Sequence, residues 1–146
     1  MRRPTLLFAS ILLPLATLAW TRSSNSAEST AVHAAAQNYM YAYYTADTAL
    51  MQRVLHPDFH KRTLRAVSGH TEITEDTALS LLQGVRSGSG LTFPSDKRVQ
   101  RIQVLDIYKD AASVKVVTSR WIDYMHLTKV NGEWRVLDVV LQYTNQ

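Results

Sequence analysis

The clearest alternation of apolar and polar positions lies in the C-terminal part of the chain, over residues 111–143. Two such runs flank Asn131-Gly132, and this dipeptide favours a type I′ turn because both of its central positions need a positive φ. The pattern predicts two long strands joined in a hairpin. A two-residue turn fixes the register, so Lys129 is expected opposite Trp134, and the pairing steps outward from there.

The predicted register divides the side chains of the hairpin between two largely apolar faces. Neither face is expected to lie in water, so one should pack on helices and the other on a second subunit or a terminal segment. The Trp-rich face comprises Trp121, Asp123, Met125, Leu127, Trp134, Val136, Asp138, Val140 and Gln142. Its two aspartates are unexpected because buried polar groups need partners. These aspartates either reach the solvent-exposed rim of the sheet, form an ion pair with an arginine, or line a pocket.

The first helical pattern begins just after residue 28 and carries an apolar stripe. Ser29 or Thr30 is expected to cap a helix that runs to about Tyr44. The stripe recurs at helical spacing and is expected to be buried; it comprises Val32, Ala35, Ala36, Tyr39, Met40 and Tyr43. Tyr39 and Tyr43 lie one turn apart on it, either as core aromatics or with a hydroxyl directed into a cavity.

Two further helices and two further strands complete the predicted order of elements. Asp47 is expected to cap a helix over residues 48–55, and Thr74, followed by two acids, to begin another. Residues 59–67 and 98–108 are expected to be strands, the second with a bulge. Helices in the N-terminal half and a meander of sequential strands predict an α+β fold, with three helices on one face of an antiparallel sheet.

The first 27 residues have the layout of a secretory signal peptide. A start with two arginines precedes an apolar run over residues 6–20, and a polar stretch then leads to Ala27. The run is shorter than the roughly 20 apolar residues of a membrane span. Cleavage is expected after Ala27, with Ala19 as an alternative site, and leaves one domain over residues 28–146. An uncleaved membrane anchor is the other interpretation.

Charge and cysteine content bear on the partners and the cellular compartment of the mature chain. The sequence has 16 Lys and Arg, of which three lie in the leader, so 13 remain against 12 acidic residues. This near balance gives no electrostatic basis for nucleic-acid binding. The chain has no cysteine, and export without disulfides is typical of a periplasmic or secreted protein that relies on its core.

His56, Asp58 and His60 alternate along the chain and would share one face of an extended segment. Such a face can hold a metal ion. Segments that follow a helix also carry these residue types as caps, and Pro57 leaves the local geometry open. We therefore predict neither a metal nor a cofactor.

Five short segments carry a resemblance to a known family. They are Tyr39 through Asp47, Leu55 through Phe59, Ala111 through Lys115, Ile122 through Tyr124, and Leu127 through Trp134. Together with the order of elements, they resemble the nuclear-transport-factor-2-like (NTF2-like, SnoaL-like) superfamily of cone-shaped folds, and most closely its bacterial "putative lumazine-binding" family. The resemblance covers nearly all of residues 28–146. It implies helices that close the concave face of a strongly curved sheet.

The same resemblance implies a pocket on the concave face for a small hydrophobic or heteroaromatic ligand, and a homodimer through the outer face. It assigns the Trp-rich face to the pocket, although the reverse assignment is the alternative. The implied pocket residues are Tyr39, Tyr43, Trp121, Asp123, Met125, Trp134 and Asp138. The implied dimer face carries Ile122, Tyr124, His126, Leu137 and Val139.

Ketosteroid isomerases of this fold offer a comparison residue by residue. They use a helix-1 tyrosine as oxyanion donor, eight residues before an aspartate like Asp47, and Tyr39 occupies that position. They also use a protonated aspartate on a late strand, close to the place of Asp123. Their general base corresponds to Arg62-Thr63, which cannot serve that role.

Three functions follow from these observations. The first is a small-molecule-binding protein that is not obviously catalytic. The second is a lyase or isomerase that uses Asp123, Asp138 and Tyr39 for acid–base chemistry, as polyketide cyclases of this fold use a pair deep in the cavity. The third is a dimeric interaction or accessory domain with a filled interior. Catalysis predicts a buried aspartate with a raised pKa beside a hydroxyl. The sequence does not decide whether the protein is an enzyme.

Overall fold

The computed structural model describes the backbone of residues 16–144 and the side chains from residue 26 onward. Its helices are α1 (Ala16–Thr45), α2 (Thr48–Val54) and α3 (Ala78–Arg86), with a 3-10 turn, η1 (Ser95–Lys97). Its strands are β1 (Leu55–Val67), β2 (His70–Thr77), β3 (Val99–Tyr108), β4 (Ala111–Thr118), β5 (Trp121–Val130) and β6 (Glu133–Tyr143). The helices precede the meander β3–β6, and the predicted α+β class is confirmed.

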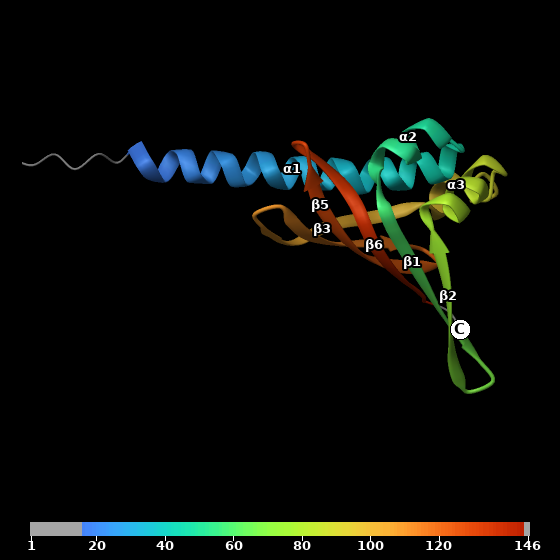
Figure 1. Cartoon of the computed structure of the whole chain (residues 1–146). Coiled ribbons are helices and arrows are strands. Elements are labelled where there is room, and N and C mark those ends of the chain that lie inside the picture. Colours follow the sequence, from blue (N-terminus) through green and yellow to red (C-terminus); the bar gives the residue numbers. More distant parts are fainter. Residues whose placement is uncertain (1–15, 145–146) are drawn as a thin grey trace, which may run out of the picture.

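The strands form one six-stranded sheet in the order β2-β1-β6-β5-β4-β3. Neighbours are antiparallel except for β1 and β6, which run parallel, so the sheet is mixed rather than purely antiparallel. Figure 1 shows α1 along one face of the curved sheet, α2 and α3 grouped near one end of α1, and the β1–β2 hairpin extending away from the helices. This is the predicted cone-shaped arrangement.

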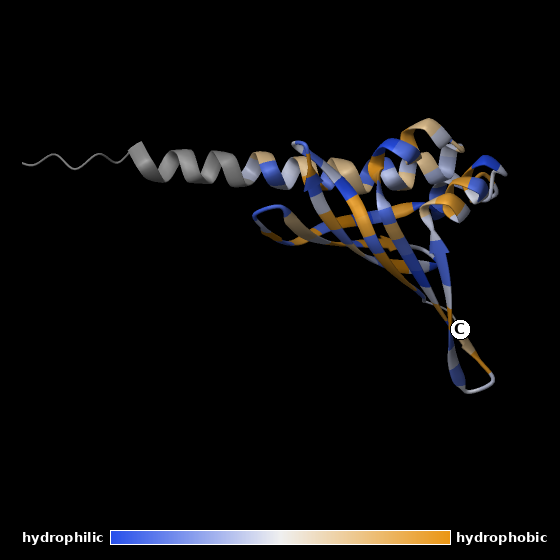
Figure 2. Cartoon of the chain, viewed as in Figure 1, coloured by the Kyte–Doolittle hydropathy of each residue, from blue (hydrophilic) through white to orange (hydrophobic). Residues whose placement is uncertain are grey.

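The core forms where the apolar stripe of α1 meets the concave face of the sheet. Val32 and Ala36 are fully buried, and Tyr39 and Met40 are almost so, which confirms the predicted stripe. Alternate positions of β4 and β5 are buried beneath the helix, and apolar segments follow these strands in Figure 2. The sheet contributes Val114, Val116, Met125, Leu127, Val136 and Val139 to this core.

The Asn131-Gly132 turn is confirmed, with φ of 52° and 84° and Lys129 opposite Trp134. The predicted register fails further out. Leu127 pairs with Val136, but His126 already pairs with Asp138, so Leu137 is an extra residue on β6. Such a bulge exchanges the faces of every residue beyond it.

The bulge corrects the predicted faces of the second half of β6. Val139 is fully buried and Leu141 is 4% exposed, so both lie on the concave face. Asp138 and Val140 lie on the outer face instead. The prediction that Asp123 and Asp138 share one face is therefore wrong, and Val139 does not belong to the outer face.

The single long strand predicted before the Asn131-Gly132 turn is also wrong, because the chain reverses at Ser119-Arg120 and forms β4 and β5. The reversal depends on Thr118, which is 2% exposed. Its hydroxyl accepts hydrogen bonds from the amides of Arg120 at 3.2 Å and Trp121 at 2.9 Å, and donates to the carbonyl of Trp121 at 2.9 Å. A threonine hydroxyl that satisfies the backbone in this way stabilises a turn.

The third helix does not begin at Thr74. Residues 70–77 form β2, which pairs with β1 across the Ser68-Gly69 turn, where φ is 48° and 84°. The helix begins four residues later and is capped by Thr77, whose side-chain oxygen accepts from the amide of Ser80 while Ser80 Oγ accepts from the amide of Thr77. Pairing with β1 outweighs the local helix signal of the two acids.

The first helix also begins before the predicted cap. It is continuous from Ala16, and the Thr30 hydroxyl donates to the carbonyl of Ser26 within the helix rather than capping it. Asp47 is confirmed as the cap of α2, since its Oδ1 accepts from the amide of Leu50 at 2.8 Å. Most of the predicted signal peptide, residues 1–15, lies outside the described residues. Within residues 16–144, no helix is long and apolar enough to cross a membrane.

The loop of residues 87–94 packs directly on the C-terminal end of α1. Gly90 in this loop is buried, and a Cβ added to it would lie 2.0 Å from the carbonyl oxygen of Tyr43. No side chain fits so close to a backbone atom. Gly84 in α3 differs, because a Cβ there would meet only Ser89 Oγ, at 3.6 Å.

Gly90→Ala is expected to lower the free energy of unfolding by about 1–3 kcal/mol, because the loop must move away from α1 to admit the methyl group. Gly84→Ala is expected to raise it by about 0.5–1 kcal/mol, because glycine loses more conformational entropy in a helix than alanine does. Urea denaturation of both variants measures the difference. Equal effects at the two positions would contradict the close packing of the loop.

Candidate functional site

A cavity of about 300 Å³ lies between α1, α3, the 87–94 loop and the concave face of the sheet. It sits beside the core rather than within it, because α1 covers only part of the curved sheet (Figure 1). Its apolar wall comprises Met40, Tyr43, Leu81, Phe93, Trp121, Leu141 and Tyr143. Its polar wall comprises Tyr39, Lys61, Thr63, Asp76, Ser80, Ser89 and Asp123.

The apolar wall is built from aromatic rings that contact one another edge to face. The Phe93 ring lies 5.2 Å from that of Trp121 at an interplanar angle of 79°, and the Tyr43 ring lies 6.4 Å from Trp121 at 89°. Aromatic pairs favour such arrangements. The guanidinium of Arg120 lies 5.2 Å from the Phe93 ring centroid, which adds a cation–π contact. These contacts join the 87–94 loop to both α1 and the sheet.

Asp123 is the most unusual polar residue of the cavity. The residue is 1% exposed. Its Oδ2 accepts a hydrogen bond from Trp121 Nε1 at 2.8 Å, whereas Oδ1 is buried with no hydrogen-bond partner among the described residues. Burial raises the pKa of the Asp123 carboxyl, and the positive charge of Lys61 and the Trp121 bond only partly oppose this shift. The group therefore tends to hold a proton, and a protonated carboxyl can donate a hydrogen bond.

Tyr39 lies on α1 near Asp123 and is 2% exposed. Burial raises the pKa of its hydroxyl well above the usual value, and the nearby charges of Asp123 and Asp76 raise it further. The hydroxyl therefore stays protonated. Tyr39, Tyr43, Trp121 and Asp123 are the sequence-predicted site residues that the structure brings together at the cavity.

The other three predicted pocket residues lie elsewhere. Asp138 is on the outer face, where its Oδ2 accepts from Arg62 at 3.3 Å, and it does not meet Asp123. Trp134 donates from Nε1 to Glu28 at 2.8 Å, near the Asn131-Gly132 turn. Met125 is 1% exposed within the core.

Several cavity residues were missed because β2 was not predicted as a strand. In the β1–β2 register, Lys61 lies opposite Asp76, and both line the cavity. The turn-forming Ser68-Gly69 pair directly after the predicted strand was the sequence signal that could have placed them. Phe93 was also missed, since nothing in a Gly- and Pro-containing loop indicates which side chain turns inward.

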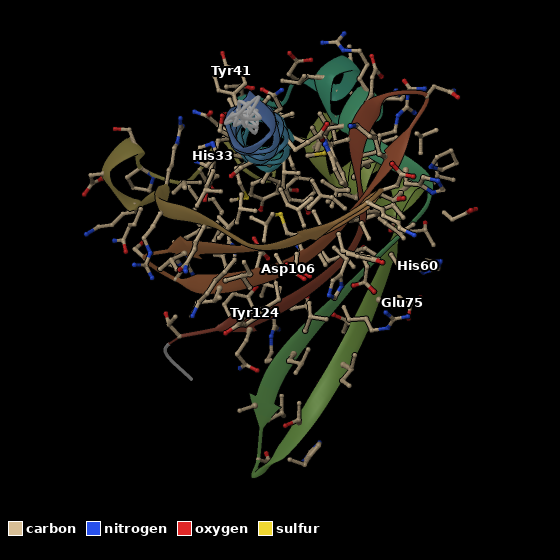
Figure 3. All side chains as sticks on the ribbon, turned by 90° about the vertical axis from the view of Figure 1, so that its left-hand side faces the viewer. His33, Tyr41, His60, Glu75, Asp106 and Tyr124 are labelled. Atoms are coloured by element: carbon tan, nitrogen blue, oxygen red, sulfur yellow. The ribbon has the colours of Figure 1, made fainter. Side chains whose placement is uncertain are left out.

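The three residues of the conceivable metal site do not converge. His56 Nδ1 lies 3.8 Å from Asp58, whereas His60 Nδ1 lies 2.6 Å from Glu75 on β2, and Figure 3 shows His60 and Glu75 side by side at the edge of the sheet. No cluster of three or more His, Cys, Asp or Glu suited to a metal ion is present in the described part of the chain.

Asp123→Asn is expected to change how stability depends on pH. A carboxyl whose pKa is higher in the folded than in the unfolded state binds more protons when folded, so stability falls as pH rises through that interval. From about pH 4, the usual pKa of an unfolded Asp, the variant should therefore gain stability relative to the wild type as pH rises. Urea denaturation at a series of pH values measures this difference. Asp138→Asn controls for loss of a carboxylate elsewhere in the sheet, and a pH-independent difference for Asp123→Asn would contradict the prediction.

Comparison with known proteins agrees with this architecture. Two solved structures show the same fold. An NTF2-like protein of unknown function from Shewanella baltica OS155 has 18% identity and a TM-score of 0.62, over 83% of this chain and 97% of that one. An NTF2-like protein with a cystatin-like fold from Novosphingobium aromaticivorans has 12% identity and a TM-score of 0.65, over 90% and 91%. A search of curated proteins found no match.

The comparison with protein families is more specific. Residues 27–141 match the family described as "Putative lumazine-binding", and this match spans most of the chain. It includes every element from the middle of α1 to nearly the end of β6. The protein therefore belongs to the "Putative lumazine-binding" family of the NTF2-like superfamily.

Proposed function

We propose that this protein binds a small planar heteroaromatic molecule in the cavity between α1, α3 and the sheet. The observation that carries the proposal is Asp123, a buried carboxyl with one unpartnered oxygen set beside aromatic rings. Family membership supports it, because the family description names lumazine, a fused two-ring heteroaromatic compound. Cavities with apolar walls and a few well-placed polar groups are the usual form of a small-molecule site.

The rings and the carboxyl would act on different parts of such a ligand. Phe93, Trp121 and Tyr43 offer aromatic ring surface, and Asp123, when protonated, can donate to a ring carbonyl while Oδ2 still accepts from Trp121. The volume of about 300 Å³ lies at the lower end of the range of about 300–1,000 Å³ for ligand sites. It suits a few fused rings better than a long chain.

A second candidate function is acid–base catalysis in the same cavity. The pair expected from the sequence is absent from it, because Asp138 lies on the outer face. Asp76 is a further carboxylate at the cavity and lies near Tyr39, and a proton donor in the same cavity as a carboxylate favours such chemistry. Turnover would appear as a time-dependent change in the absorbance of the bound ligand.

Calorimetric titration of residues 28–146 with lumazine and riboflavin tests the binding proposal. We expect binding of at least one of them by the wild type, and a loss of at least about tenfold in affinity for Asp123→Leu, which removes the oriented hydrogen bond. Asp123→Asn keeps a donor and an acceptor in the same place, so it should retain most of the affinity.

The matched control is Asp138→Leu, which removes a carboxylate from the same sheet on its outer face. It should bind like the wild type. Failure of every planar heteroaromatic probe to bind would overturn the proposal, as would equal losses in the Asp123→Leu and Asp138→Leu variants.

We also propose that a second copy of this chain covers the outer face of the sheet. Tyr124 is 42% exposed there. Its half-buried neighbours are Ile122, two residues before it on β5, and Val140, opposite it on β6. A group of exposed apolar side chains on a sheet face is often covered by another surface. Figure 3 shows Tyr124 on the side of the sheet opposite α1, while Tyr41 points away from the sheet on the far side of that helix.

Tyr124→Glu is expected to weaken self-association, because it places a charge in the centre of the proposed contact. Tyr41→Glu is the control, since Tyr41 is more exposed, at 57%, but lies on the opposite side of the molecule. Sedimentation velocity over a range of protein concentrations measures the change. A wild-type chain that stays monomeric throughout, or a control that dissociates equally, would contradict this proposal.

A further inference from the structure

We propose that Lys61 makes this cavity selective for heteroaromatic ligands whose bound edge carries oxygen acceptors rather than amino groups. The inference rests on the proposed function and deepens it, because it assigns a specificity-determining residue and a chemical class of ligand. No motif in the sequence singles out Lys61.

Lys61 is a half-buried cation without an ion pair at the cavity wall. It lies on β1 with Asp76 opposite on β2 and Val139 opposite on β6, and its side chain lines the cavity. No ion pair within 4.0 Å and no hydrogen bond involves its ammonium group within residues 26–144. An ammonium group has three donors and no acceptor, so partial burial without a partner is costly.

The next residue along β1, Arg62, offers a comparison. Arg62 faces outward and forms two ion pairs, with Glu75 at 3.4 Å and with Asp138 at 3.3 Å. Arg62 thus has two carboxylate partners, whereas Lys61 has none among the described residues. A ligand in the cavity could supply an acceptor to Lys61.

The other polar groups of the cavity make the excess of donors larger. Asp76 Oδ1 already accepts a hydrogen bond from Ser80 Oγ at 2.9 Å, so half of that carboxylate is engaged. The Tyr39 hydroxyl is a donor, and the Asp123 carboxyl is a donor when protonated. A ligand edge with carbonyl oxygens would satisfy these groups. An amino group on that edge is itself a hydrogen-bond donor. It could not accept from Lys61, which would stay unpaired.

Three pteridines of nearly equal size test this inference: lumazine with two oxo groups, pterin with one oxo and one amino group, and 2,4-diaminopteridine. At slightly alkaline pH, where the diamino compound is uncharged, the wild type should bind lumazine at least about tenfold more tightly than 2,4-diaminopteridine, the factor that corresponds to a weak charge-assisted hydrogen bond. Pterin should fall between them.

Lys61→Met keeps the length of the side chain but removes its donors, and it should reduce this ratio to near one. Lys61→Arg keeps a cation and should retain the selectivity, so a ratio lost in Lys61→Met and kept in Lys61→Arg cannot come from general unfolding. Binding of all three pteridines without preference, or an unchanged ratio in Lys61→Met, overturns this inference and leaves the proposed function standing. Failure of the wild type to bind any of the three overturns both.

Discussion

The structure depends on the burial of one apolar stripe of α1 against the concave face of a curved sheet. The sheet residues of this core belong largely to β4, β5 and β6, and α1 also packs on β3 while α2 contacts β6. A single helix is about 10 Å wide with its side chains and fills only part of a concave face. The remaining part, towards β1 and α3, is the cavity of about 300 Å³. The pocket is therefore a consequence of how a straight helix meets a curved sheet.

Closure of this cavity depends on a contact that leaves no room for a side chain. The 87–94 loop reaches α1 at Gly90, where only hydrogen fits beside the carbonyl of Tyr43. That approach brings Phe93 onto Trp121 and completes the aromatic wall. The loop thus contributes to the site through its packing, although its sequence alone suggests only a connector.

The polar groups on the two faces of the sheet differ in how far they pair with one another. On the outer face, ion pairs link His60, Glu75, Arg62 and Asp138, although Asp138 Oδ1 has no hydrogen bond among the described residues. On the cavity side, Lys61 has no ion pair and Asp123 Oδ1 has no hydrogen bond within the described residues. Buried polar groups normally have partners, so the unsatisfied set at the cavity supports a role in binding.

The sequence by itself determined the features that depend on near neighbours. The Asn131-Gly132 turn, the apolar stripe of α1 and the Asp47 cap follow from local backbone and side-chain chemistry, and the resemblance carried by five short segments indicated the fold. Only the tertiary structure decided which polar residues reach the cavity. One extra residue at Leu137 moves Asp138 to the outer face, and pairing with β1 turns Thr74 to Thr77 into a strand that sets Asp76 opposite Lys61. These outcomes depend on hydrogen bonds between strands far apart in the chain. The local sequence does not determine which of two registers such strands adopt.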